Sequence, residues 1–414
     1  MTTTPALAQA HASPDARWLV PLADVLVDSE IDDAVTDVVR SGWWSMGPKV
    51  EEFERELASF CDTRSAIAVA NGTAALHLAL LAVGCGPGDE VLVASLNFVA
   101  VANVIGHVGA TPVFCDVSSP LDLNVDPEDL EAAVTPATKA VVVMHYGGHP
   151  CRMDAIRALA DRHGLVVVED AAHALGARWD GRPCGSIGDV GCFSFFANKN
   201  LATGEGGMLV TDDEELARRL RLLRSHGMTA LTWDRHRGHA HDYDVVERGF
   251  NYRLDELRAA IGLVELRRLA ARNEARARIV ARYRSELDGV AGLRMPFDDD
   301  ADAAHHLAVV LLPEDRPRDA VRAGLAAAGI QTSVHYPPIH RFSYYEELGA
   351  RRALPVTDAV ADRLLTLPLY PHMRDTDVAA VTEATLRLVG HSPRRGTNGR
   401  QRRQPTEIGG KVWN

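Results

Sequence analysis

The sequence predicts an α/β fold with a mostly parallel β-sheet, followed by a smaller C-terminal α+β domain. Short runs rich in β-branched residues alternate with helical segments between residues 66 and 170, and this pattern is typical of parallel strands that are buried on both faces. Long helical patterns dominate from about residue 253 to residue 288. Shorter strand and helix patterns follow them, which favours a separate second domain.

The N-terminal part of the chain is expected to be helical after a disordered segment, residues 1–16. Ile31, Val35 and Val38 recur at helical spacing, and the helix that they predict ends at Ser41-Gly42. A second helix begins after a proline, in the stretch "VEEFERELASF".

The next region supplies the strands of the predicted sheet. They are "AIAVA" (66–70), "EVLVAS" (90–95), "TPVFCDV", "KAVVVMHY" and "LVVVED" (165–170). The segment "GCGPGDE" (84–90) resembles a dinucleotide-binding fingerprint, but it follows a helix and precedes a strand. That motif needs the opposite order, so we interpret the segment as a helix-to-strand turn.

Two domains are expected, a large one over residues 17–265 and a small one over 266–391. In the second, "HHLAVVLLP", "GIQTSVHY" and further helical segments favour an α+β arrangement. The tail over 392–414 is basic and rich in Gly, Pro, Gln and Arg, so we expect it to be disordered.

Composition limits the classes of function. The chain has 414 residues, 46% of them apolar and 24% charged, as in an ordinary globular protein with a large core. Its net charge of −12 disfavours general nucleic-acid binding. The six cysteines are scattered without a C-x-x-C pair, so neither a zinc site nor a disulfide framework is indicated, and a reducing compartment fits. With no signal-peptide pattern and no long apolar run, we expect a cytoplasmic protein without a membrane segment.

One lysine stands out because of its surroundings. The stretch "FSFFANKNLATGEGG" (193–207) carries Lys199 from an apolar run into a glycine-rich segment. Lysine is rarely buried without a reason, and clustered glycines mark tight turns or close approach of the backbone to a ligand. Two interpretations are open: a solvated turn lysine after a core strand, or an amine desolvated so that it acts as a nucleophile.

Three further features follow predicted strands, at the edge of an α/β sheet where ligands bind. Asp170 ends "LVVVED" and is placed to pair with a cation such as a protonated pyridine nitrogen. Asn71-Gly72-Thr73 stands between a strand and a helix, where N–H groups and a hydroxyl can bind phosphate, although such residues are also ordinary helix caps. Phe98 follows "EVLVAS", where its ring can cover a flat ligand or join the core. Together with an amine nucleophile, these features indicate pyridoxal 5′-phosphate (PLP) held as a Schiff base.

On these residues, the chain resembles the DegT-type sugar aminotransferases, which are PLP enzymes of fold type I that act on nucleotide-linked keto sugars. The resemblance covers roughly residues 20–390. It rests on motifs in the expected order: "SGWWSMGPKVEEFE", "NGTAALHLAL", "GPGDEVLVASLNFVAVANVI", "EDAAHALGA", "FSFFANKNLATGEGG", "YDVVERGFNYRLDELRAAIG", "SVHYPPIH" and "LPLYP".

The resemblance implies roles for individual residues. Lys199 matches the Schiff-base lysine, and Asp170 matches the partner of the pyridinium nitrogen. His173 matches the position beside the 3′-oxygen of the cofactor, for which a surface helix histidine is the alternative. The phosphate ligands and the ring-stacking aromatic are matched by a further set: Gly72, Thr73, Ser194 and Phe98.

Three more positions carry expectations about the partner subunit and the substrate. Asn251, in "GFNYR", matches a phosphate contact that the family takes from the partner subunit, which implies a homodimer with shared active sites. The alternative is a helix cap within its own subunit. Arg253 and Tyr336 are candidates for substrate contacts, with a salt-bridged arginine and a core tyrosine as the alternatives.

The chain departs from many relatives beside the reactive lysine: they have His-Pro before the x-Lys, whereas this chain has Phe196-Ala197 before Asn198-Lys199. Dehydratase relatives have histidine instead of the lysine, so the retained Lys199 favours transamination. The stretch "HRGHAHD" (236–242) contains three histidines, which we interpret as part of a mobile loop near the substrate. No cysteine or carboxylate cluster completes a metal site there, and we predict no metal.

We therefore expect a PLP-dependent aminotransferase of amino-sugar biosynthesis, with pyridoxamine 5′-phosphate as the cofactor form between its half-reactions. The expected partners are L-glutamate or L-glutamine as the amino donor and a nucleotide-linked keto sugar as the acceptor. Two enzymatic alternatives are open, a keto-cyclitol aminotransferase and a PLP-dependent sugar dehydratase. A PLP-binding regulatory protein without turnover is an alternative of a different class.

Overall fold

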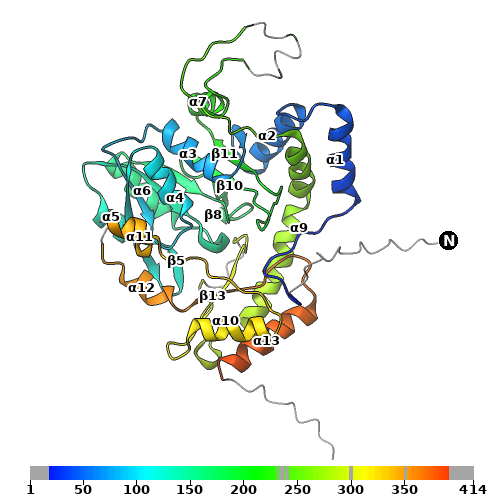
Figure 1. Cartoon of the computed structure of the whole chain (residues 1–414). Coiled ribbons are helices and arrows are strands. Elements are labelled where there is room, and N and C mark those ends of the chain that lie inside the picture. Colours follow the sequence, from blue (N-terminus) through cyan, green and yellow to red (C-terminus); the bar gives the residue numbers. More distant parts are fainter. Residues whose placement is uncertain are drawn as a thin grey trace, which may run out of the picture.

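The computed structural model describes residues 18–230, 233, 238, 242–297, 302–348 and 352–390. The segments predicted to be disordered, 1–16 and 392–414, lie outside these residues, as does most of "HRGHAHD". Figure 1 shows a large α/β domain above a smaller domain, with helix α9 (Glu256–Leu287) passing from one to the other. The predicted boundary at residue 265 falls within α9, which is continuous there, and the domain boundaries stay a prediction.

A seven-stranded sheet forms the centre of the large domain, in the order β1-β11-β10-β7-β6-β2-β3. Its strands are β1 (Ser65–Val69), β2 (Glu90–Ala94), β3 (Thr111–Cys115), β6 (Thr138–Met144), β7 (Val166–Asp170), β10 (Val190–Ser194) and β11 (Gly207–Thr211). The strands from β10 to β3 are parallel, whereas β11 runs antiparallel to both of its neighbours. The predicted α/β fold with a mostly parallel sheet is therefore confirmed.

Helices cover both faces of this sheet, and this explains why its strands are apolar almost throughout. One face packs against α3 (Gly72–Ala82), α4 (Ala100–His107) and α7 (Glu214–Arg224). The other face packs against α2 (Pro48–Phe60), α5 (Pro127–Ala133), α6 (Met153–His163) and the first half of α9. Helix α1 (Ser29–Ser41) lies outside, against α9.

Short elements connect these layers. Two hairpins occur, β4 (Val117–Ser119) with β5 (Asp122–Val125), and β8 (Arg178–Trp179) with β9 (Arg182–Pro183). Single 3₁₀ turns are found at η1 (Tyr146–Gly148), η2 (Val290–Gly292) and η3 (Ile339–Arg341). Helices α11 (Ser343–Glu347) and α12 (Pro355–Ala361) return to the large domain, where they lie near α5 in Figure 1. Asp116 caps α12, because its Oδ1 accepts the N–H of Thr357 at 2.7 Å.

The small domain packs the second half of α9 against an antiparallel pair, β12 (Ala308–Leu311) and β13 (Leu364–Leu367), and against α10 (Arg318–Ala327) and α13 (Asp375–Leu388). The N-terminal segment joins this core, since Val20 is buried in it and pairs with Ile330. The stretch "HHLAVVLLP" contains β12, whereas "GIQTSVHY" forms isolated bridges at Ile330 and Ser333.

Some properties concern the described chain as a whole. Even α9, with 32 residues, has no apolar stretch that could cross a membrane, and neither does any other described helix. Within the described ranges, no three His, Cys, Asp or Glu side chains come together as a metal site would require. All six cysteines are buried and free.

Candidate active site

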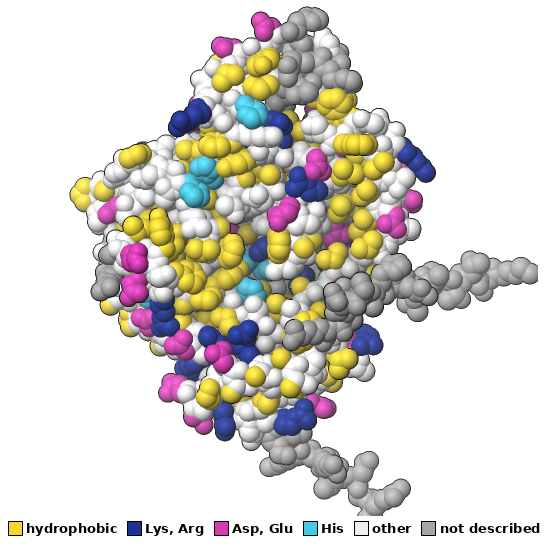
Figure 2. All heavy atoms as spheres, viewed as in Figure 1, with side chains coloured by type: hydrophobic (Ala, Val, Ile, Leu, Met, Phe, Trp, Pro, Cys, Tyr) yellow, Lys and Arg dark blue, Asp and Glu magenta, His cyan; other side chains and the backbone are white. Residues whose placement is uncertain are grey.

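A cavity of about 410 Å³ lies beyond the carboxyl ends of the parallel strands, the edge of an open α/β sheet at which ligands bind. Figure 2 shows a hollow between the two domains in which histidine and Lys or Arg side chains are visible. Most of the residues proposed from the sequence line the cavity: Gly72, Thr73, Phe98, Asp170, His173, Ser194, Lys199 and Tyr336. They come from the start of α3, from the last residues of β7 and β10, from the loops after β2, β7 and β10, and from the segment after α10.

Lys199 lies in a tight turn that begins where β10 ends. The ring of Phe195 is fully buried in the core, and the N–H of Lys199 donates to the carbonyl of Phe196 at 2.8 Å, which closes the turn. Burial lowers the pKa of the Lys199 amine to about 8, while the charge of Asp170 opposes this change. Lys199 is half-buried rather than exposed, and its lowered pKa favours the desolvated amine over the solvated turn lysine.

The glycine-rich stretch after Lys199 is explained by close contacts between backbone segments. Phe195 donates its N–H to the carbonyl of Gly206 at 2.8 Å, which holds the returning chain against the lysine turn. A Cβ on Gly206 would lie 2.5 Å from the hydroxyl of Thr203, and a Cβ on Gly207 would lie 2.6 Å from the backbone of Asn71. These two positions therefore require glycine.

Asp170 presents a buried carboxylate to the cavity. It is 6% exposed, and its Oδ1 accepts the N–H of Ala172 at 3.2 Å. Burial raises the pKa of Asp170, although the Ala172 hydrogen bond and the Lys199 charge lower it in part. A carboxylate that is buried with so few partners is poised to pair with a cation.

The preceding residue, Glu169, points to the opposite face of β7, as successive strand residues do. It accepts hydrogen bonds from His145 Nε2 at 2.9 Å and from the N–H groups of Gly185, Ile187 and Gly188. Burial alone would raise the pKa of Glu169, but these hydrogen bonds, His145 first, lower it overall. Glu169 therefore holds the loop before β10, whereas Asp170 faces the cavity.

The start of α3 forms an anion site on the cavity wall. Asn71 caps the helix, because its Oδ1 accepts the N–H of Ala74 at 2.8 Å. A Cβ on Gly72 would lie 2.7 Å from the Cβ of Ser194, so glycine is needed for the end of β10 to approach this helix so closely. Thr73 and Ser194 then bring their hydroxyls to the positive end of the helix dipole, which suits a phosphate.

His173 and Tyr336 form a hydrogen-bonded pair between the two domains. The Nδ1 of His173 accepts the N–H of Gly147 at 3.3 Å, so Nε2 carries the proton of the neutral ring and donates it to the Tyr336 hydroxyl at 2.9 Å. Burial, and then the Lys199 charge, hold the pKa of His173 well below its ordinary value. His173 is 3% exposed and follows β7 in a turn, so the surface helix alternative is wrong.

The aromatic residue expected to cover the ligand ring lies at the rim of the cavity. Phe98 is 53% exposed and lies against Tyr336, with ring centroids 5.6 Å apart. It is therefore not a core phenylalanine, which was the alternative for this position.

Two histidines near the site, the buried His306 and the half-buried His335, were not identified from the sequence. His306 lies 4.4 Å from His173 between ring centroids and hydrogen-bonds to Asn200 at 3.0 Å. His335 lines the cavity, bonds to Thr366, and has its pKa lowered to about 4, first by burial and then by the Lys199 charge. In the sequence, both could have been noticed: His306 belongs to the histidine pair before "LAVVLLP", and His335 directly precedes Tyr336.

Asn251 and Arg253 do not line this cavity. Their backbones pair with Ser225 and with Val69, at the end of β1. Asn251 is exposed, and α9 is capped by Asp255, so Asn251 does not cap that helix. Burial lowers the pKa of Arg253, and the charge of Arg224 adds to this effect.

The residues of the cavity fit PLP chemically. The buried carboxylate of Asp170 suits a pyridinium nitrogen, and the start of α3 suits a phosphate. The amine of Lys199 has a pKa near the range in which a nucleophile is useful. The cavity volume of about 410 Å³ also falls within the range of cofactor sites.

Comparisons with known proteins agree on one family. The sequence profile described as the DegT/DnrJ/EryC1/StrS aminotransferase family matches residues 26–386. The spore coat polysaccharide biosynthesis protein SpsC of Bacillus subtilis (strain 168) is 46% identical over 379 residues, which cover 89% of this chain and 97% of SpsC.

Solved structures give the same result. The aminotransferase TlmJ from Streptoalloteichus hindustanus has a TM-score of 0.83 at 36% identity, with 90% of this chain and 99% of TlmJ covered. A Streptococcus pneumoniae protein solved in its PMP form has a TM-score of 0.84 at 31% identity, with 89% of this chain and 99% of that protein covered. The same protein has also been solved in a PLP form.

Proposed function

Because this chain belongs to the DegT/DnrJ/EryC1/StrS aminotransferase family, we propose that it transfers the amino group of L-glutamate or L-glutamine to a nucleotide-linked keto sugar. Family and relatives establish the coarser statement, a PLP-dependent sugar aminotransferase. The donor and the nucleotide are our proposal. SpsC is named for polysaccharide biosynthesis, and the Helicobacter pylori relative PseC is described as an aminotransferase in pseudoaminic acid biosynthesis, which supports a sugar acceptor.

The observation that carries the proposal is the amine of Lys199 beside the carboxylate of Asp170 in one cavity. When bound, PLP supplies an aldehyde that combines with amines and a ring that takes up the electron pair left when a Cα–H bond breaks. With a pKa of about 8, the amine of Lys199 is neutral often enough to act as the nucleophile and to take the Cα proton. The carboxylate of Asp170 would stabilise a proton on the ring nitrogen of the bound cofactor.

The other residues of the cavity bind and orient. The N-terminus of α3 with Thr73 and Ser194 would hold the phosphate. Phe98 would cover one face of the ring, and His173 would lie beside its 3′-oxygen, hydrogen-bonded to Tyr336. The retained Lys199 disfavours the dehydratase alternative. Because the family consists of enzymes, the regulatory alternative is set aside.

We further propose a homodimer in which Asn251 reaches the phosphate of the partner subunit. Asn251 is exposed outside the cavity of its own chain, which supports this role. Phe98 and Phe196 line the cavity and are 53% and 46% exposed, as apolar residues are when a second subunit covers them.

Absorbance spectroscopy tests the donor, and mass spectrometry tests the acceptor. The purified protein should be yellow, and L-glutamate or L-glutamine should bleach this colour in the wild type but not in Lys199→Ala. The bleached enzyme is then incubated with nucleotide-linked keto sugars or keto-cyclitols, and the masses of the products are measured by mass spectrometry. An aminated sugar nucleotide is the expected product. Amination of cyclitols alone, or bleaching by neither donor, would contradict the proposal.

A further inference from the structure

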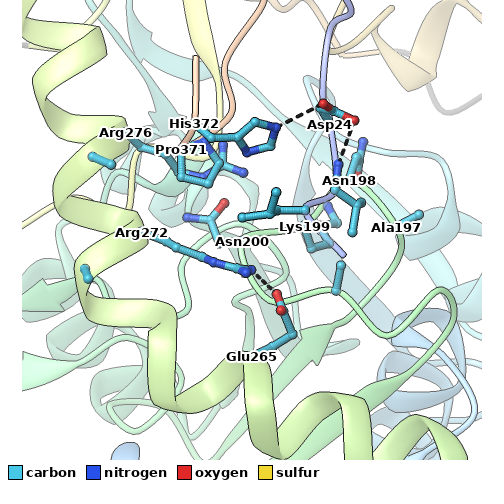
Figure 3. A pocket seen from close by; sticks show the side chains of 15 residues that line it. Asp24, Ala197, Asn198, Lys199, Asn200, Glu265, Arg272, Arg276, Pro371 and His372 are labelled. Atoms are coloured by element: carbon cyan, nitrogen blue, oxygen red, sulfur yellow. Dashed lines mark hydrogen bonds and ion pairs between the residues drawn. The ribbon is translucent and has the colours of Figure 1, made fainter. Parts of the chain in front are cut away.

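A second cavity lies beside the first and shares Asn198 and Lys199 with it. Its volume is about 230 Å³. Its walls come from α9, from the segment 24–26 before α1, and from Pro371-His372 after β13, as Figure 3 shows. None of the roles proposed above uses this cavity.

Arg276, on α9, is a buried cation in the wall of the second cavity. It is 4% exposed, and it donates through Nη1 to the carbonyl of Leu369 at 3.0 Å. Its Nε is buried and has no hydrogen-bond partner among the described residues. The guanidinium has no carboxylate partner among those residues either. Burial, and then the charge of Arg272, lower the pKa of Arg276 to about 10. A buried charge without a counter-ion is costly, so this position favours the binding of an anion.

Apart from Lys199, which also lines the first cavity, the other charged groups of this cavity are already paired. Arg272 pairs with the carboxylate of Glu265 on the same helix, α9, and Asp24 pairs with His372 at 3.0 Å on the other side, both shown as dashed lines in Figure 3. Glu265 is 2% exposed, and its Oε1 has no partner in the described chain. The amine of Lys199 has the opposite charge of Asp170 near it, whereas no such charge acts on the guanidinium of Arg276 among the described residues.

We propose that the second cavity is a binding site for a small carboxylate, with Arg276 as the principal ligand. Arginine binds carboxylates through paired, charge-assisted hydrogen bonds, and the volume suits a molecule of amino-acid size. A hydroxyl or ammonium group on the same molecule would also satisfy Glu265. Two sources share this chemistry: the amino donor itself, or a separate acid that regulates the enzyme through the turn of Lys199.

Calorimetry of the holoenzyme with glutarate tests the site, because this dicarboxylate has no amino or keto group and cannot react. Wild type should bind glutarate, and Arg276→Met should bind it about 10-fold to 100-fold more weakly. Arg278→Met is the matched control, since Arg278 is an exposed arginine of the same helix, and it should bind as the wild type does. Glu265→Gln should bind more tightly, because it removes a negative charge and frees Arg272.

Arg276→Met also loses the hydrogen bond to Leu369, so a second variant keeps the test decisive if it does not fold. Ala275 lines the cavity, and Ala275→Phe should fill it and abolish binding with Arg276 intact. No binding of glutarate by wild type would overturn the site. So would wild-type affinity in the folded Arg276→Met or Ala275→Phe protein, or weaker binding by Glu265→Gln.

A competition experiment distinguishes the two sources. If the site holds the donor, glutarate should raise the apparent Kd of L-glutamate in the bleaching reaction without changing its maximal rate. If the site is regulatory, glutarate should change the maximal rate of bleaching and leave the apparent Kd of L-glutamate unaltered. Binding by calorimetry needs no turnover, so failure of the proposed function would leave the test of the site intact.

Discussion

Replacing Asp170 by asparagine should abolish most activity without destabilising the protein. The carboxylate is 6% exposed; it accepts the N–H of Ala172, and the charges of Lys199 and then His145 act on it. Burial raises its pKa, so the ionised form is unfavourable in the folded protein above the pKa of the unfolded chain. Asparagine has the same shape and no charge. The free energy of unfolding at pH 7 should therefore stay the same or rise.

The expected loss of activity follows from the loss of a buried charge partner. Removing one member of a buried ion pair costs about 3–5 kcal/mol. Since each 1.36 kcal/mol is about tenfold in rate, kcat should fall by roughly 150-fold to 5,000-fold. The assay is steady-state amination by the PLP-loaded enzyme, with urea unfolding of the same preparations.

Glu169→Gln is the matched control, because Glu169 is the adjacent buried carboxylate on the opposite face of β7. It holds His145 and three backbone N–H groups, so its replacement should lower the free energy of unfolding more than it lowers kcat. An Asp170→Asn enzyme within tenfold of wild type would refute the reasoning, and Asp170 would then be a structural residue at a strand end.

The remaining predictions concern the lysine, acid stability and the subunit interface. In the cofactor-free protein, the rate at which Lys199 combines with PLP should rise with increasing pH, with a midpoint near pH 8. This midpoint should move to lower pH in Asp170→Asn, because the carboxylate charge raises the lysine pKa. A midpoint near pH 10 would contradict the burial of the amine. The pKa of Glu169 is lowered in the folded state, so the ionised carboxylate stabilises the protein at pH values above its pKa in the unfolded chain. This stabilisation is lost as the pH falls through the pKa of the folded state. Between pH 7 and pH 3, the free energy of unfolding in urea should therefore change less in Glu169→Gln than in wild type. Mixing Lys199→Ala with Asn251→Ala should restore up to about a quarter of wild-type activity after subunit exchange, since half of the dimers then carry one intact site; no recovery would place Asn251 outside the neighbouring site.

Much of the site could be predicted from the sequence because its residues follow strands. Asp170 and Ser194 end apolar runs, and Gly72 begins the helix that follows another such run. In a parallel sheet such positions meet at one edge, so a local pattern predicts a shared location. The glycines after Lys199 were also visible as a signal, although the reason for each became clear only from the contacts that a Cβ would make.

Other features depend on contacts between distant segments. The antiparallel strand β11 lies between β1 and β10, and nothing in its own sequence specifies those neighbours. His306 belongs to the small domain but contacts His173 of the large one, so its role near the site is decided by how the domains pack. The joining of Val20 to the small-domain core is likewise invisible in a pattern of local periodicity.

The sequence by itself determined the parallel sheet, the ends of its strands and the residue types that a PLP site needs, because hydrophobic periodicity and turn chemistry act over a few residues. The tertiary structure decided which groups are desolvated and which are paired. The pKa of Lys199, the proton position on His173 and the unpaired charge of Arg276 all depend on chain segments that are far apart in sequence. Electrostatic energies in a protein are set by burial and by neighbouring charges, and both exist only once those segments have folded against each other.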